Sequence, residues 1–144
     1  SKGVKDMYKI VVASHGKFSE GCLDTIKFFI KDTENISTLV LDNDGIEKFK
    51  ESVKELFNEI KDSNVLIFVD LFHGTPFNVC SENIGLINGE AEIVSGVNIP
   101  MLFEAVLNSN SMSVSEAVQN IKNTQYINTL SEELANLTTN EDDE

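Results

Sequence analysis

The chain lacks arginine altogether, and its eleven lysines stand against twenty-four acidic residues. Without a basic patch, nothing is available to neutralise the phosphates of a nucleic acid, so we expect no nucleic-acid partner. Cysteine is also scarce. Cys22 and Cys80 have no CxxC spacing and lie in apolar helical patterns, which indicates two core residues rather than a zinc site or a disulfide framework.

Long apolar runs are missing as well. The longest, Val65 to Val69, is far too short to cross a bilayer, and no charged-then-apolar leader opens the chain. We therefore predict a cytoplasmic protein. Met7 reads like a native start, so residues 1–6 are interpreted as an added segment, and residues 138–144 are predicted to be a disordered acidic tail.

Negative charge is concentrated in the second part of the chain. Residues 1–61 carry ten lysines and eleven acidic residues, whereas residues 62–144 carry one lysine and thirteen acidic residues. Such an acidic surface is either simply solvated or steers a partner that has a basic face.

Strand and helix patterns alternate along residues 7–137, which we interpret as a single domain. Continuously apolar strands separated by amphipathic helices predict an α/β fold. The expected architecture is a doubly wound, mostly parallel sheet of four strands with helices on both faces. Residues 125–130 are predicted to add a short C-terminal edge strand. The four main strands are expected at Ile10–Ala13, Ile36–Leu41, Val65–Val69 and Ala91–Ser95.

Polar residues ahead of the apolar stripes predict where the helices begin. Ser19 and Thr75 have side chains that commonly cap helix N-termini, and Pro76 suits the first helical position after Thr75. Capping-box spacing occurs twice, in Asp44 with Glu47 and in Ser113 with Glu116.

A polar turn that contains an imidazole ends the first strand. His15 follows the run Ile10–Ala13, and Asp70 follows Val65–Val69. Because the carboxyl ends of parallel strands meet at one rim of the sheet, we expect these two side chains to be neighbours. A carboxylate that accepts a hydrogen bond from one imidazole nitrogen leaves the other nitrogen unprotonated and nucleophilic. The pair therefore predicts capture of a phosphoryl group.

The turn after Asp70 is suited to an anion. Gly74 permits close backbone approach, and the amides of Thr75, Phe77 and Asn78 lie at the positive end of a predicted helix. The Thr75 hydroxyl bonds either the helix end or a phosphoryl oxygen. We predict these four residues as the phosphoryl-binding group, with no metal and no cofactor.

Three stretches, in this order and spacing, are similar to one known family: residues 10–16 (IVVASHG), 70–78 (DLFHGTPFN) and 96–104 (GVNIPMLFE). They resemble the IIA components of the mannose family of the bacterial phosphoenolpyruvate-dependent sugar phosphotransferase system. The resemblance implies that His15, with Asp70 as its partner, is phosphorylated by the phosphohistidine of the carrier protein HPr. It further implies transfer to a separate IIB protein for sugar uptake, contact with the membrane only indirectly through the transporter complex, and a homodimer that exchanges the C-terminal edge strand.

The usual family pattern has glycine where this chain has His73. The His73 imidazole either donates to phosphoryl oxygens, completes a two-histidine, one-carboxylate metal site with His15 and Asp70, or simply packs in its loop. A metal on His15 would block its nucleophilic nitrogen, so none is predicted. Ser14 adjoins His15, but neighbouring strand residues point to opposite faces and GxSxG is absent, which argues against a serine hydrolase. His73 and Ser14 are auxiliary candidates.

Three functional classes stay open. The first is a phosphoryl carrier in sugar uptake, which the third stretch favours. The second is a regulatory phosphoryl-accepting or small-ligand-binding domain on the same fold, like those that work with dihydroxyacetone kinase. The third is a metal-dependent hydrolase that uses His15, Asp70 and His73. No GxGxxG or Walker-type loop supports a nucleotide binder.

Overall fold

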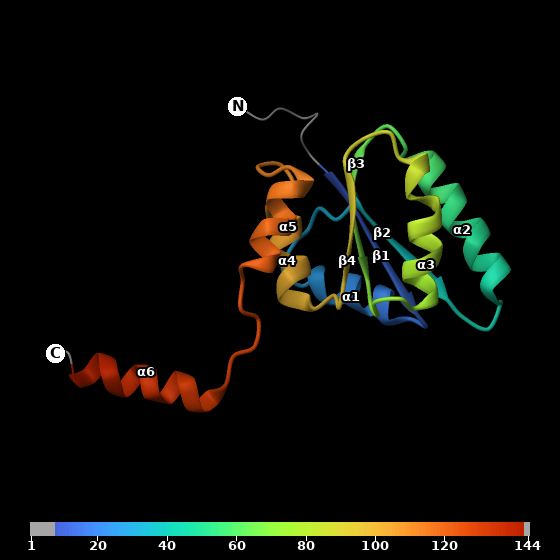
Figure 1. The fold of residues 1–144 in the computed structure, drawn as a ribbon. Coiled ribbons are helices and arrows are strands. Elements are labelled where there is room, and N and C mark those ends of the chain that lie inside the picture. The colour runs from blue at the N-terminus through green and yellow to red at the C-terminus, as the bar shows by residue number, and fades with distance from the viewer. Residues whose placement is uncertain (1–7, 143–144) are drawn as a thin grey trace.

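The computed structural model of the protein describes residues 8–142, which form a parallel sheet with helices on both faces (Figure 1). The predicted segment 1–6 and residues 143–144 lie outside the described residues. The sheet order is β2-β1-β3-β4, and every strand pair is parallel. This confirms the predicted doubly wound α/β fold. The strands are β1 (Tyr8–His15), β2 (Ile36–Leu41), β3 (Asn64–Val69) and β4 (Ala91–Ser95).

The helices divide between the two faces of the sheet. In Figure 1, α1, α4 and α5 lie on one side of the strands, and α2 and α3 lie on the other. Within residues 8–142, no helix has both the length and the apolar character needed to cross a membrane. The helical elements are α1 (Phe18–Ile26), α2 (Ile46–Glu59), α3 (Thr75–Asn83), the 3₁₀ turn η2 (Ile84–Leu86), α4 (Ile99–Leu107), α5 (Val114–Lys122) and α6 (Leu130–Asp142).

Two apolar clusters, one on each face, bury the central strand β1. Ile10 and Val12 belong to the cluster on the α1, α4 and α5 side, whereas Val11 and Ala13 belong to the α2 and α3 side. All four side chains are buried. A strand covered on both faces requires a continuous apolar run, which is the pattern seen in the sequence. Continuing the alternation puts His15 on the α3 side of the sheet.

The capping box of Ser113 and Glu116 is confirmed at the start of α5, where both reciprocal hydrogen bonds form. The prediction that Ser19 caps α1 is wrong. The N-cap position is Lys17, and the buried Ser19 hydroxyl donates to the carbonyl of Leu39 in β2. A hydroxyl inside the first turn thus ties α1 to the sheet instead of satisfying a helix amide.

At the N-termini of α2 and α3 the structure also differs from the predicted caps. The N-cap position of α2 is Gly45, with a φ of 97° and no side-chain cap, so Asp44 and Glu47 form no capping box. The main-chain amide of Asp44 instead donates to the side chain of Asp42, because a local Asx turn competes with the cap. In α3, Thr75 is the first helical residue and Gly74 occupies the N-cap position.

The predicted edge strand over residues 125–130 does not form within the described chain. Residues 124–129 have no strand assignment, and α6 begins at Leu130 and extends away from the sheet (Figure 1). A strand exists only through hydrogen bonds to a neighbouring strand, and this segment has none here. The Tyr126 hydroxyl donates to the carboxylate of Glu104 at 3.4 Å and holds the segment against α4. Helix α6 reaches into residues 138–142, which the sequence places in a disordered tail.

Candidate functional site

His15 and Asp70 meet at the carboxyl ends of two adjacent strands. His15 ends β1, Asp70 directly follows β3, and these strands pair with each other. His15 Nδ1 lies 2.9 Å from Asp70 Oδ2, and the His15 main-chain amide donates to the same oxygen at 2.9 Å. The imidazole side chain is 45% exposed. With Nδ1 directed at the carboxylate, the neutral ring has its lone pair on Nε2.

Hydrogen bonds keep the Asp70 carboxylate ionised. Burial raises the pKa of Asp70, but hydrogen bonds from the His15 amide and imidazole and from the Leu71 amide outweigh it. The pKa therefore lies below its ordinary value, and Asp70 is a carboxylate at neutral pH. The main-chain carbonyl of Asp70 accepts a hydrogen bond from the Gly96 amide at 3.2 Å. The stretch 96–104, which begins directly after β4, is therefore hydrogen-bonded to the loop that contains Asp70.

Gly74 packs directly against the His15 imidazole. A Cβ placed on Gly74 would stand 2.9 Å from His15 Cε1, which is closer than real side chains approach. The next residue, Thr75, opens α3. Among the described residues, the amides of Thr75 and Phe77 have no hydrogen-bond acceptor. The N-terminus of α3 therefore presents two open amides beside the imidazole, and the helix dipole favours an anion there.

The structure differs from the predicted role of the Asn78 main-chain amide. Its main-chain amide donates to the Gly74 carbonyl at 2.9 Å, which is the first hydrogen bond inside α3. This amide is therefore not open to an anion. The Asn78 side-chain amide donates to the His73 carbonyl at 3.2 Å, so Asn78 holds the shape of the loop from within the helix.

Ser14 is a buried part of the turn. Its hydroxyl donates to the Gly16 carbonyl at 2.9 Å and accepts from the Ser19 amide at 2.8 Å. Both contacts lie on the α1 side of the strand, opposite the face that His15 occupies. Ser14 thus fixes the turn that follows β1 instead of joining the site.

His73 contacts aromatic side chains of its own loop and of α3. Its ring packs on Phe72, with centroids 3.9 Å apart, and meets the edge of Phe77 at 5.5 Å. No group of three histidine, cysteine, aspartate or glutamate side chains that could hold a metal occurs along residues 8–142. His73 adopts a φ of 63°, a left-handed conformation that glycine adopts without strain, which gives a physical reason for glycine in the family pattern.

Replacing His73 with glycine is expected to raise the free energy of unfolding by up to about 1 kcal/mol, because it removes this backbone strain. Urea unfolding monitored by circular dichroism measures the change. The control is His73→Ala, which removes the ring but keeps the strained φ, and should be destabilised relative to His73→Gly. Equal stability of the two variants would show that the conformation costs nothing.

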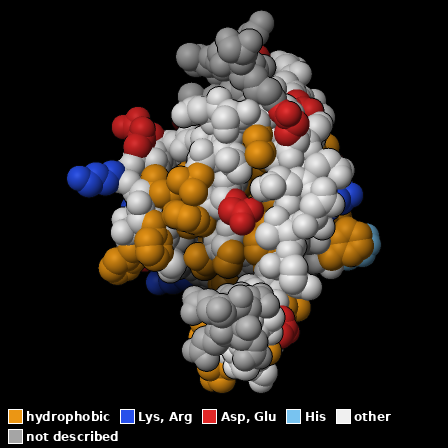
Figure 2. Space-filling view, turned by 90° about the vertical axis from the view of Figure 1, so that its left-hand side faces the viewer, with side chains coloured by type: hydrophobic (Ala, Val, Ile, Leu, Met, Phe, Trp, Pro, Cys, Tyr) orange, Lys and Arg blue, Asp and Glu red, His pale blue; other side chains and the backbone are white. Residues whose placement is uncertain are grey.

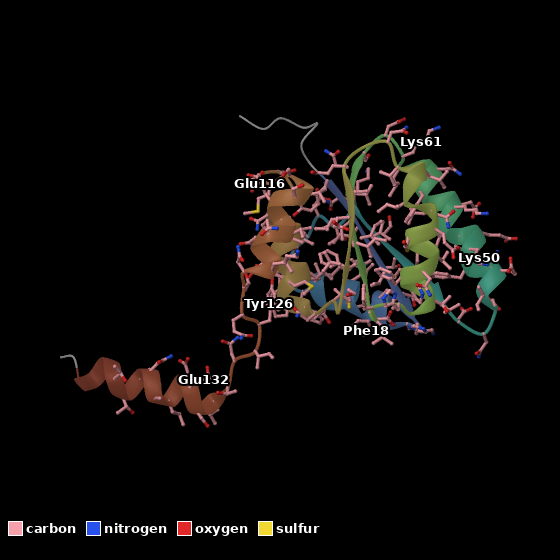
Figure 3. All side chains as sticks on the ribbon, in the orientation of Figure 1. Phe18, Lys50, Lys61, Glu116, Tyr126 and Glu132 are labelled. Carbon is pink, nitrogen blue, oxygen red and sulfur yellow. The ribbon has the colours of Figure 1, made fainter. Side chains whose placement is uncertain are left out.

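Sequence reasoning missed an apolar border in the loops that follow β1 and β3. Leu71, Phe72 and Phe18 are 60%, 63% and 49% exposed, and Figure 3 places Phe18 at the rim where the strands end. The signal was present in Leu71-Phe72, two large apolar residues in succession within a turn. Exposed apolar residues of this kind commonly mark contact with another protein.

Comparisons with known proteins point to one family. A family described as PTS system fructose IIA component matches residues 9–122. The sorbose-specific EIIA component of Lacticaseibacillus casei is 28% identical over 114 residues, which are 78% of this chain and 82% of that protein. The mannose-specific EIIAB component of Escherichia coli (strain K12) is 30% identical over 100 residues, which are 68% of this chain and 31% of that protein.

A solved structure agrees along nearly the whole chain. The PTS IIA protein associated with the fucose utilization operon of Streptococcus pneumoniae is 31% identical, with a TM-score of 0.76, and the match covers 92% of this chain and 99% of that one. The family match includes β1 to α5, and with them the loops that contain His15, Asp70 and Gly74. The chain therefore belongs to the mannose family of IIA components of the sugar phosphotransferase system.

Proposed function

We propose that this protein is a phosphohistidine carrier, which accepts a phosphoryl group on His15 Nε2 from HPr and passes it to a IIB component. The observation that supports this best is the contact between His15 Nδ1 and Asp70 Oδ2 at 2.9 Å. It directs the other nitrogen of a 45% exposed ring away from the carboxylate. A nucleophile that has to serve two protein partners in turn needs such exposure.

The first half-reaction exchanges one nitrogen–phosphorus bond for another. The Nε2 lone pair attacks the phosphorus of the donor phosphohistidine, the donor bond breaks, and the electron pair returns to the donor imidazole. Positive charge develops on the His15 ring, and the ionised Asp70 stabilises it through the Nδ1–H bond. The amides of Thr75 and Phe77 and the Thr75 hydroxyl bind the transferring oxygens, since phosphoryl transfer depends mainly on positioning and charge stabilisation. Transfer to IIB reverses these steps.

The border of Leu71, Phe72 and Phe18 supports a macromolecular donor and acceptor. A partner that covers these side chains would exclude water from the phosphoryl group during transfer and protect the labile bond. The exposed apolar surface and the nucleophile lie at the same rim of the sheet, so one docking geometry serves both purposes.

The homodimer implied by the family resemblance is also part of this proposal. Residues 124–129 have no strand partner within their own chain. β4 is an outer strand of the sheet order β2-β1-β3-β4. Pairing of this segment with β4 of a second copy would give it the partner that the predicted edge strand requires.

The test is phosphorylation of the purified chain by phosphoenolpyruvate, the general phosphotransferase enzyme and HPr. We expect intact-mass spectrometry to show one acid-labile phosphoryl group per chain, and NMR to locate it on Nε2 of His15. Loss of the group on addition of a IIB protein supports the transport function. A phosphorylated chain that passes its group to no IIB protein would indicate a regulatory domain, and a chain that is never phosphorylated would overturn the proposal.

Substituting alanine for Gly74 is expected to slow phosphoryl uptake about tenfold or more, because the new methyl group displaces the imidazole from its position on Asp70. Stopped-flow or quench-flow kinetics with phosphorylated HPr measures the rate. Gly21→Ala is the matched control, since a Cβ on Gly21 would meet nothing within 4 Å. An uptake rate in Gly74→Ala equal to that of the control would contradict the proposed role of the close packing.

A further inference from the structure

Two consecutive main-chain amides in the loop after β4 hold the carboxylate residue of the candidate site. The Gly96 amide donates to the carbonyl of Asp70, and the Val97 amide donates to the carbonyl of Val69, both at 3.2 Å. These two carbonyls belong to the two planar peptide groups on either side of the Asp70 Cα. The direction of the Asp70 side chain therefore depends on hydrogen bonds from residues 96–98, which are called the β4 loop from here on.

The positive φ of Gly96 makes this pair of hydrogen bonds possible. Successive amides of an extended strand point to opposite sides, so Gly96 and Val97 could not both donate to the end of β3 if β4 simply continued. Gly96 adopts a φ of 74°, a left-handed conformation that turns successive N–H groups toward one side. Beyond its chain neighbours, a Cβ on Gly96 would meet nothing within 4 Å. Glycine is therefore favoured here by backbone conformation and not by lack of space.

The β4 loop is anchored beyond Gly96 in the body of the protein. Val97 is buried in the apolar cluster on the side of the sheet that α4 and α5 cover. That side faces the viewer in Figure 2, where apolar side chains also gather on its outer surface. The Asn98 side chain accepts a hydrogen bond from the Met101 amide at 2.8 Å and caps α4. Core packing and a helix cap thus make the β4 loop a fixed support for Asp70.

The Asp70 carboxylate has to be oriented accurately because it makes three hydrogen bonds at once. Oδ2 accepts from the His15 amide and lies 2.9 Å from His15 Nδ1, and Oδ1 accepts from the Leu71 amide at 2.9 Å. The Leu71 amide belongs to the same peptide group as the carbonyl that Gly96 holds. A rotation of that peptide group would move the Leu71 amide and turn the carboxylate relative to the imidazole.

We propose that Gly96 is a positioning residue for phosphoryl transfer, because its left-handed conformation holds Asp70 in the orientation that accepts from His15 Nδ1. The inference rests on the proposed carrier function and assigns to it a residue that acts through Asp70. A side chain that favours negative φ weakens the hydrogen bond to the Asp70 carbonyl. The imidazole then loses its oriented acceptor, and a smaller share of the neutral ring has its lone pair on Nε2.

The variants Gly96→Ala and Gly96→Asn test this role. At about pH 9, where imidazoles are ordinarily neutral, the ¹⁵N chemical shifts of the His15 ring report the shares of its two tautomers. We expect Gly96→Ala to lower the share protonated on Nδ1, and to slow phosphoryl uptake from phosphorylated HPr about fivefold or more. Gly96→Asn should restore most of both, because asparagine tolerates a positive φ better than alanine.

The matched control is Gly45→Ala. Gly45 also has a positive φ, 97°, and a Cβ on it would meet nothing within 4 Å, but it precedes α2 and its amide donates to Asp42. Both alanine variants should unfold at a lower urea concentration, whereas the His15 tautomers and the uptake rate should change only in Gly96→Ala. Equal uptake rates in the two alanine variants would overturn the proposal. Unchanged tautomers in Gly96→Ala, or no recovery in Gly96→Asn, would overturn it as well.

Amide hydrogen exchange of the unmodified chain adds a measurement that needs no variant to fold. The Gly96 and Val97 amides should exchange about tenfold or more slowly than those of Thr75 and Phe77, which have no acceptor among the described residues. Similar exchange rates in the two pairs would contradict the proposed support of Asp70. Neither the exchange nor the tautomer measurement requires a phosphoryl donor, so failure of the carrier function and failure of this positioning role are observed separately.

Discussion

No phosphoryl uptake is expected in the His15→Ala variant, whichever donor concentration is used. The chain has two histidines, and only His15 has a carboxylate that accepts a hydrogen bond from Nδ1. Alanine removes the attacking nitrogen itself, so no residual rate above background should be measured. Intact-mass spectrometry after incubation with phosphoenolpyruvate, the general enzyme and HPr gives the result directly.

The matched control is His73→Ala. The His73 ring packs against Phe72 and Phe77, so uptake should continue at close to the unmodified rate. Because the His15 side chain is 45% exposed, its removal should change the free energy of unfolding by no more than about 1 kcal/mol. A variant without His15 that still gains an acid-labile phosphoryl group would refute the assignment of the nucleophile.

The central sheet and the neighbouring positions of His15 and Asp70 follow from the sequence because they depend on strong, local signals. An apolar run covered on both faces marks a central strand, and parallel topology places successive strand ends at one rim. Once β1 and β3 are adjacent, a residue at the end of each must lie near the other. The 2.9 Å contact between the two side chains is the geometric consequence.

Other features depend on which of two possible hydrogen-bond partners a group takes, and the sequence does not reveal that choice. Ser19 has a side chain that suits an N-cap, but a buried carbonyl of β2 takes its hydroxyl. Asn78 supplies an amide near the helix start, but the first turn of α3 uses it. In both cases two acceptable partners exist, and tertiary geometry decides between them.

The C-terminal segment shows a different limit. Apolar residues at 126, 127 and 130 predict a strand, yet a strand needs a neighbour, and a single chain leaves residues 124–129 unpaired. The apolar pattern of one chain predicts a strand but does not identify the strand that pairs with it.

Replacing Asp70 with asparagine is expected to reduce the rate of phosphoryl uptake on the order of 10²-fold or more while leaving the fold intact. The amide keeps the size of the side chain but removes the charge that stabilises the imidazolium. It also brings N–H groups toward the main-chain amides of His15 and Leu71, which now donate to the carboxylate. Rapid-quench kinetics with phosphorylated HPr measures the rate, and Asp24→Asn, at an exposed position on α1, controls for the change in net charge.

The Asp70→Asn substitution should also change how the free energy of unfolding depends on pH. Hydrogen bonds lower the folded-state pKa of Asp70, so the ionised group stabilises the folded state above its unfolded pKa of about 3.9. This contribution is lost as pH falls through the lower folded-state value. Asp70→Asn lacks it at every pH, so the stability difference from the unmodified chain should be full at pH 7 and shrink below about pH 4. Urea unfolding as a function of pH measures it. A difference in free energy of unfolding that is as large at pH 2 as at pH 7 would contradict this prediction, because it would not depend on the ionisation of Asp70.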